Sequence, residues 1–171
     1  ADNPFVISPT YSGIGDHIKI RINGLTQWVG IKDAPDTQSL AADARVGEKS
    51  GIGMLLYNDS NGETKQRGAR LSFAHHLTLD RYDDEFMSFG ISYNFNQFRI
   101  DIENFRDNND ASVTDDRATT NHNFDVGILY RKDKFYLSAN ASNLLDKDLT
   151  KFNPVFEPNR LRNYYIYTGY R

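Results

Sequence analysis

Apolar and polar side chains alternate along most of this chain. The clearest case is residues 17–30, where Ile18, Ile20 and Ile22 alternate with polar neighbours. A period of two places successive side chains on opposite faces of a β-strand. We therefore predict a strand with one apolar and one polar face. Trp28 continues the apolar parity near its end, as is typical of the aromatic girdle where a barrel meets the membrane–water interface.

The same alternation recurs and predicts an all-β protein without helices. The further predicted strands cover residues 37–46, 51–57, 69–77, 87–95, 98–103, 124–131, 135–142 and 161–171. After residues 96–97 the apolar parity reverses, which predicts either a tight turn or a β-bulge. Most connections are short, which favours antiparallel neighbours in a meander.

The chain of 171 residues corresponds to one domain. Residues 1–16 contain two prolines and several turn-forming residues, so we expect an irregular N-terminal lead-in. Residues 17–171 carry the strands. Two longer connections are predicted, an acidic loop at residues 106–120 and a segment at residues 145–159 that contains two prolines.

Either a soluble sandwich or a membrane barrel could produce this alternation. The mean hydropathy is −0.63, and the sequence contains no run long and apolar enough for a membrane-spanning helix. A membrane barrel needs apolar residues only at alternate positions, so its average hydropathy resembles that of a soluble protein. The polar positions are rich in Gly, Ser, Asn, Asp and Arg, which suits a confined, hydrated lumen. We therefore favour an antiparallel up-and-down outer-membrane β-barrel over the soluble sandwich.

Charged residues recur at the polar positions of the predicted strands. They are Lys19, Arg21, Asp43, Arg45, Arg70, Arg99, Asp101, Asp125 and Arg131. We expect them to face the lumen and to pair across it. Because both signs are present, structural ion pairs are favoured over a selectivity filter.

The sequence contains no pattern typical of a catalytic, cofactor or metal site. Cysteine is absent, and His75 and His76 are adjacent, so their side chains point to opposite faces of a strand. No G-x-S-x-G nucleophile motif is present, and residues 107–110 lack the spacing of a calcium loop. We expect no catalytic residues, no cofactor and no metal. A net charge of −3 without a basic tract makes nucleic acid an unsuitable partner.

A family resemblance adds to this interpretation. Residues 27–40 read Q-W-V-G-I-K-D-A-P-D-T-Q-S-L, which resembles the pattern Q-W-x-G-I-x-x-A-P-x-T-x-x-L of the PorP/SprF outer-membrane proteins of the type IX secretion system. The matching positions, to which we assign a structural role, are Gln27, Trp28, Gly30, Ala34, Pro35, Thr37 and Leu40. Residues 3–13 are similar to the family's N-P-x-x-x-N-P-A-Y-A-G start, with Ser8, Thr10 and Ser12 as departures from it.

The resemblance implies a non-enzymatic outer-membrane component of type IX secretion. Such a component supports protein export and, in gliding bacteria, the delivery or anchoring of surface adhesins. The implied partners are outer-membrane lipid, other secretion or gliding machinery proteins, and secreted adhesin cargo. The lead-in and the acidic loop are the expected contact surfaces. A passive porin is the alternative function, and a soluble ligand-binding β-barrel is a third.

The resemblance also indicates whether the predicted strands form a whole barrel. We count about eight or nine strands, whereas the family barrel needs more, so this chain is expected to be part of a larger barrel. A genuine small barrel of eight strands is the alternative that geometry allows.

Overall fold

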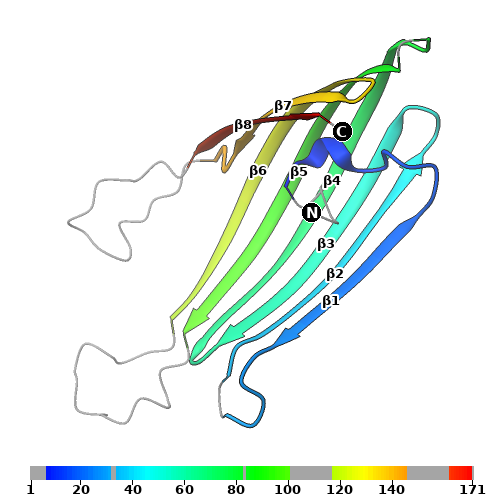
Figure 1. Ribbon diagram of the computed structural model, residues 1–171. Coiled ribbons are helices and arrows are strands. Elements are labelled where there is room, and N and C mark those ends of the chain that lie inside the picture. Colours follow the sequence, from blue (N-terminus) through cyan, green and yellow to red (C-terminus); the bar gives the residue numbers. More distant parts are fainter. Residues whose placement is uncertain (1–6, 32–33, 83, 101–116, 146–161, 171) are drawn as a thin grey trace.

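Eight strands form one antiparallel sheet in the computed structural model, which describes residues 7–31, 34–82, 84–100, 117–145 and 162–170 (Figure 1). Each strand pairs with its sequence neighbours, so the order is β1 to β8 without a crossover. The strands are β1 (Lys19–Thr26), β2 (Asp36–Val46), β3 (Ser50–Asn61), β4 (Thr64–Asp80), β5 (Glu85–Ile100), β6 (Arg117–Lys132), β7 (Phe135–Ser142) and β8 (Asn163–Tyr170). The predicted all-β, up-and-down architecture is confirmed. Among the described strands, β1 and β8 do not pair with each other, so the sheet is open.

The two faces of the sheet have the opposite character from those of a water-soluble protein. On the outer face, Phe73 and Ile91 are 47% and 45% exposed. On the inner face, Ser92 and Asp125 are only 1% and 4% exposed. Water would penalise such an apolar exterior, whereas hydrocarbon would not. The alternation therefore places apolar side chains outward and a polar layer inward, as in a membrane barrel.

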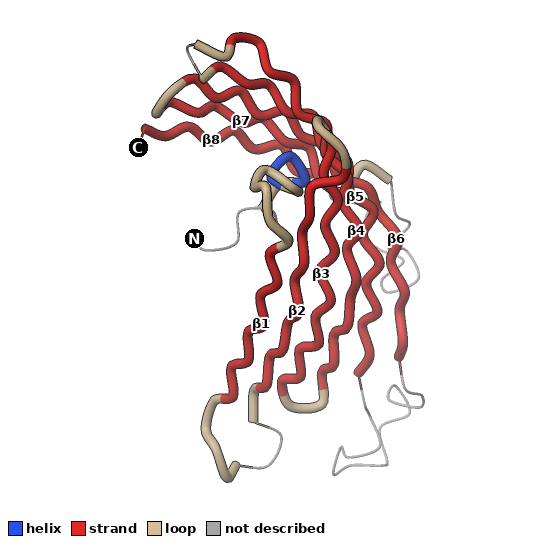
Figure 2. The backbone as a smooth tube through the Cα atoms, turned by 90° about the vertical axis from the view of Figure 1, so that its right-hand side faces the viewer, coloured by secondary structure: helices blue, strands red, loops and turns tan. Residues whose placement is uncertain are grey.

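Helices contribute little to the described part of the chain. A short 3-10 helix, η2 (Pro9–Tyr11), precedes the strands and lies inside the curve of the sheet (Figure 2). No described helix has the length and apolar character that crossing a membrane requires.

Several strands are longer than their hydrophobic pattern predicts. β4 spans 17 residues and β5 spans 16, which corresponds to roughly 55 Å at about 3.3 Å per residue. A tilted strand needs only about 9–11 residues to cross the hydrocarbon. Residues 64–67 at the start of β4 carry polar side chains on both faces, so alternation could not reveal this end of the strand. The stretch between the predicted strands at residues 51–57 and 69–77 is thereby reduced to a tight turn at Gly62 and Glu63.

The strand predicted over residues 17–30 extends too far at its C-terminal end. β1 ends at Thr26, and Trp28 lies in the following connection with φ of 51°. Its backbone amide is not part of a β-ladder; instead, its carbonyl accepts a turn hydrogen bond of 3.0 Å from the amide of Ile31. Trp28 is 66% exposed at this edge of the sheet. The strand assignment of Trp28 was wrong because parity alone does not detect a left-handed turn residue.

The turn or β-bulge predicted after residues 96–97 is also wrong. β5 stays in register with β4 from Phe86 through Ile100, without a turn or bulge after Gln97. Arg99 therefore falls on the same face as Phe95 and Ile91 rather than toward the lumen. The reversal in the sequence reflects the end of the apolar belt, where the outer face no longer needs hydrophobic side chains.

The two rims of the sheet differ. One rim carries the connections at residues 47–49, 81–84 and 133–134, and we call it the short-turn rim. At the opposite rim, which we call the long-connection rim, residues 27–35 join β1 to β2 and residues 62–63 join β3 to β4.

The outward apolar belt leads to a first testable expectation. Ile91→Lys should lower the free energy of unfolding in lipid vesicles by about 2 kcal/mol, because an ammonium group would face hydrocarbon. Ile91 lies beside Phe73 and Val126 on neighbouring strands. Urea titration followed by tryptophan fluorescence measures the change. Tyr82→Lys is the control, since Tyr82 is fully exposed in a turn; an equal effect of both variants would contradict a lipid-facing Ile91.

Candidate functional site on the inner face of the sheet

The lead-in folds onto the inner face of the sheet. Residues 7–16, which we call the inner segment, pack through η2 against β4, β5 and β6 (Figure 2). Ser8, Thr10 and Ser12 are completely buried there. Ser8 caps η2, because its hydroxyl accepts a hydrogen bond of 3.3 Å from the amide of Thr10. Pro9 occupies the first helical turn, where a missing amide proton costs nothing.

A row of small residues receives the inner segment. Pairing across four strands places in one line Gly51, Ala74, Gly90 and Gly127. A Cβ atom on Gly90 would lie 2.5 Å from the backbone nitrogen of Thr10, and one on Gly51 would lie 2.1 Å from the carbonyl oxygen of Ser12. The two backbones could not approach this closely past a side chain. The row therefore provides the space in which this segment packs, and we call these four residues the seat of the inner segment.

Hydrogen bonds fasten the C-terminal part of the inner segment. His76 donates from Nε2 to the carbonyl oxygen of Ser12 at 2.9 Å, while its Nδ1 lies 2.8 Å from the hydroxyl of Ser88. The amide of Gly13 donates to the Asp43 carboxylate at 3.3 Å. The Asp43 carboxylate on β2 and the His76 imidazole on β4 thus satisfy two backbone groups that the segment would otherwise bury unpaired.

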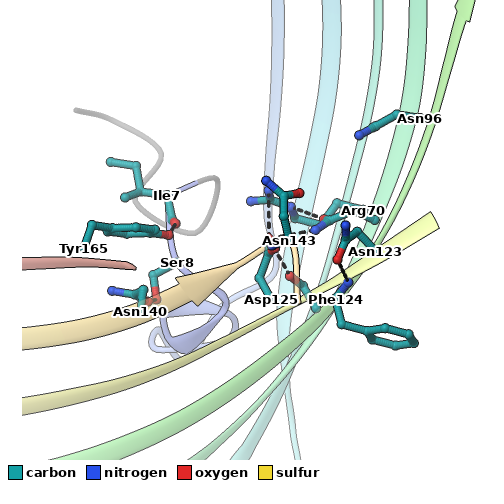
Figure 3. A network of polar contacts seen from close by, with 12 residues as sticks. Ile7, Ser8, Arg70, Asn96, Asn123, Phe124, Asp125, Asn140, Asn143 and Tyr165 are labelled. Carbon is teal, nitrogen blue, oxygen red and sulfur yellow. Dashed lines mark hydrogen bonds and ion pairs between the residues drawn. The ribbon is translucent and has the colours of Figure 1, made fainter. Parts of the chain in front are cut away.

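The N-terminal part of the inner segment is fastened to β7 and β8 (Figure 3). The hydroxyl of Ser8 donates to Asn140 Oδ1 at 2.5 Å, and the hydroxyl of Tyr165 donates to the carbonyl oxygen of Ile7 at 2.5 Å. The ring of Tyr11 stacks on that of Tyr167 with 6.4 Å between centroids. The segment consequently bridges strands from both halves of the sheet.

A second polar cluster surrounds Asp125 on the inner face, on the side of the inner segment away from the short-turn rim (Figure 3). Its carboxylate lies 3.2 Å from the guanidinium of Arg70 and accepts hydrogen bonds from Asn94 Nδ2 at 2.7 Å and from the amide of Asn143 at 3.1 Å. Ser92 donates a further bond of 3.3 Å. Asp125 is therefore well satisfied although it is buried, as a structural ion pair requires.

The other charged residues expected in the lumen have different surroundings. Arg21 pairs with Asp43 at 2.9 Å, and Arg45 pairs with Asp16 of the inner segment at 2.5 Å. Lys19 reaches over Gly15, and Arg131 lies over the ring of Phe86 at 4.8 Å. Asp101 lies outside the described residues. These two ion pairs join neighbouring strands or join a strand to the inner segment, whereas the Arg70–Asp125 pair joins β4 to β6 across β5.

Comparison with protein families identifies the chain. Its sequence matches the family described as type IX secretion system membrane protein PorP/SprF over residues 1–171, the whole chain. The chain belongs to the PorP/SprF family. The resemblance found in the sequence is confirmed, and this PorP/SprF protein is a type IX secretion component of the outer membrane. Neither the search of curated proteins nor that of solved structures found a match.

The family motif of this PorP/SprF protein lies at the long-connection rim. Gln27, Gly30, Ala34 and Pro35 belong to the β1–β2 connection, which is closed by a bond of 2.9 Å from the Gln27 amide to the Pro35 carbonyl. Gly30 has φ of 95°, which glycine adopts without strain. Thr37 and Leu40 lie in β2, where the Thr37 hydroxyl bonds the Asp59 carboxylate on β3. The motif residues thus shape one turn and its adjoining strand.

The lead-in does not offer the open contact surface expected from sequence. Its described residues form the inner segment, whose central residues are buried against the sheet. Residues 1–6 lie outside the described part of the chain. Of the predicted acidic loop, residues 117–120 belong to β6 and residues 106–116 lie outside the described residues.

The inner segment packs closely on the inner face of the sheet. The described residues contain no cluster of His, Asp or Glu that could hold a metal ion. Sequence reasoning missed the seat for the inner segment. Its signal was the recurrence of Gly or Ala at one level of four neighbouring strands, which becomes visible only once the register is known.

Proposed function

We propose that this PorP/SprF protein is a plugged, non-enzymatic barrel that supports type IX secretion by contacts with other envelope proteins rather than by conducting solutes. The observation that carries this proposal is the inner segment, seated on glycines and bonded to four strands. A passive porin would instead keep its lumen open to water. The burial of Ser8, Thr10 and Ser12 supports a filled interior.

The finer role that we propose is to support the export, delivery or anchoring of cargo such as gliding adhesins. The family assignment supports a secretion role, and the filled lumen favours action through the rims. Outer-membrane lipid and other secretion or gliding machinery proteins are the proposed partners. The passive porin remains the second candidate, and conductance separates the two.

Conductance of the full-length protein in planar bilayers tests the first part of the proposal. We expect no steady current steps, because the inner segment occupies the lumen and is hydrogen-bonded to four strands. The reconstituted protein should be folded under the same conditions, as judged by its β-type circular dichroism spectrum. Steady, ungated conductance would contradict the plugged barrel and favour the porin.

Secretion in the native host tests the second part. Deleting the gene should remove a subset of secreted or surface-attached proteins from the medium and cell surface, and the wild-type gene should restore them. Quantitative proteomics of both fractions measures the loss. An unchanged set of exported proteins would contradict the secretion role independently of the conductance result.

A further inference from the structure

A cavity of about 250 Å³ lies at the short-turn rim, between the inner segment and the strands β2, β4, β5 and β6. We call it the rim pocket. It is lined by Ile14, Asp16, Arg45, His76, Phe86, Ser88, Leu129 and Arg131. Its volume is sufficient for one or two side chains.

The rim pocket contains two arginines, Arg45 and Arg131, but one carboxylate, that of Asp16. Arg45 is paired with Asp16 at 2.5 Å, and both ring nitrogens of His76 are engaged by Ser12 and Ser88. Arg131 has only the ring of Phe86 beside it, at 4.8 Å, and no described carboxylate forms an ion pair with it. The nearby carboxylate of Glu85 is instead 3.6 Å from Lys132. One guanidinium is therefore available to a ligand.

We propose that the rim pocket binds an acidic side chain from a segment of a partner protein, with Arg131 as its cationic contact. A guanidinium group matches a carboxylate with two parallel hydrogen bonds. Ile14, Phe86 and Leu129 provide apolar walls for the methylene groups that precede such a carboxylate. The pocket already accepts one carboxylate of this chain, that of Asp16 on Arg45.

The position of the pocket assigns its partner to the periplasm. In outer-membrane barrels the short turns face the periplasm and the longer connections face outward. The rim pocket adjoins the short-turn rim. Asp16, one of its lining residues, has a side chain that is 78% exposed. A periplasmic segment could therefore reach Arg131 without crossing the barrel.

Calorimetric titration of the purified full-length protein at low ionic strength tests this site. The probes are a blocked Gly-Glu-Gly tripeptide, acetylated and amidated, and the same peptide with glutamine in place of glutamate. We expect the glutamate peptide to bind at least tenfold more tightly. Equal binding of the two peptides would overturn the proposal. A Gly-Gly-Gly peptide with a free C-terminal carboxylate should bind more weakly, and equal affinity would overturn the assignment to a side chain.

Two variants locate the binding on Arg131. Arg131→Gln should weaken binding of the glutamate peptide about tenfold, whereas Arg67→Gln at the opposite rim should leave it unchanged. Asp16→Asn should strengthen binding about tenfold, because it removes the competing carboxylate and releases Arg45. Unchanged affinity in Arg131→Gln, or weaker affinity in Asp16→Asn, would overturn the proposal. This site goes beyond the proposed function, and its failure would leave the conductance and secretion results unaffected.

Discussion

Gly90→Leu is expected to make the protein conduct ions, which the wild type with its inner segment in place is not expected to do. A Cβ atom at this position would lie 2.5 Å from the backbone nitrogen of Thr10 and 2.6 Å from the carbonyl carbon of Pro9. Backbone atoms cannot rotate away as a flexible side-chain end would. The larger leucine side chain would therefore force the inner segment off its seat, at a cost of about 1–3 kcal/mol for overpacking.

Current steps in planar bilayers measure this opening, and chymotrypsin cleavage after Tyr11 reports release of the segment. We expect steady conductance and rapid cleavage in Gly90→Leu, with neither in the wild type. Gly24→Leu is the matched control, since a Cβ atom at Gly24 would meet nothing within 4 Å. A Gly90→Leu protein that stays closed and protected would contradict the role of the inner segment as a plug.

Asp125→Ala should lower the free energy of unfolding by about 3 kcal/mol, because it removes one member of a buried ion pair and the acceptor of several hydrogen bonds. The Arg70 side chain is only 21% exposed and would lose the carboxylate that lies 3.2 Å away. Asn94 and the amide of Asn143 would lose their acceptor as well. Urea titration of the protein in lipid vesicles measures the change.

A double variant separates the pair from general damage to the inner face. Arg70→Met combined with Asp125→Leu should recover much of the lost stability, because no uncompensated charge remains. Glu48→Ala, in an exposed turn, should have almost no effect. If Asp125→Ala were as stable as the wild type, the Asp125 cluster would not contribute to holding the strands together.

The order of strands and the division of their faces were predictable from sequence. A period of two is a local property of the backbone, so Ile20, Phe73 and Ile91 could be assigned to one face without knowing their neighbours. The short connections then favoured a meander, which the pairing confirms. The family resemblance around Gln27 and Pro35 was likewise readable from a short stretch, and the family match confirms it.

Strand ends were less predictable, because the signal comes from contact with lipid. At the start of β4 and of β6 both faces are polar and alternation disappears, whereas in β5 the apolar parity reverses at Phe98; the ladder continues through all three strands. Arg99 was misplaced because of this reversal, and Trp28 because parity does not detect a turn residue with positive φ. Hydrogen bonds between strands maintain the extended backbone there, and these bonds leave no trace in hydropathy.

The sequence by itself therefore determined the fold class, the apolar side chains of the outer face and the family. Only the tertiary structure decided that the inner segment packs on the inner face of the sheet, and that Gly51, Gly90 and Gly127 lie in one row beneath it. The physical reason is register: residues far apart in the chain become neighbours only when the strands are aligned. The same alignment brings Arg131 beside the inner segment and forms the rim pocket.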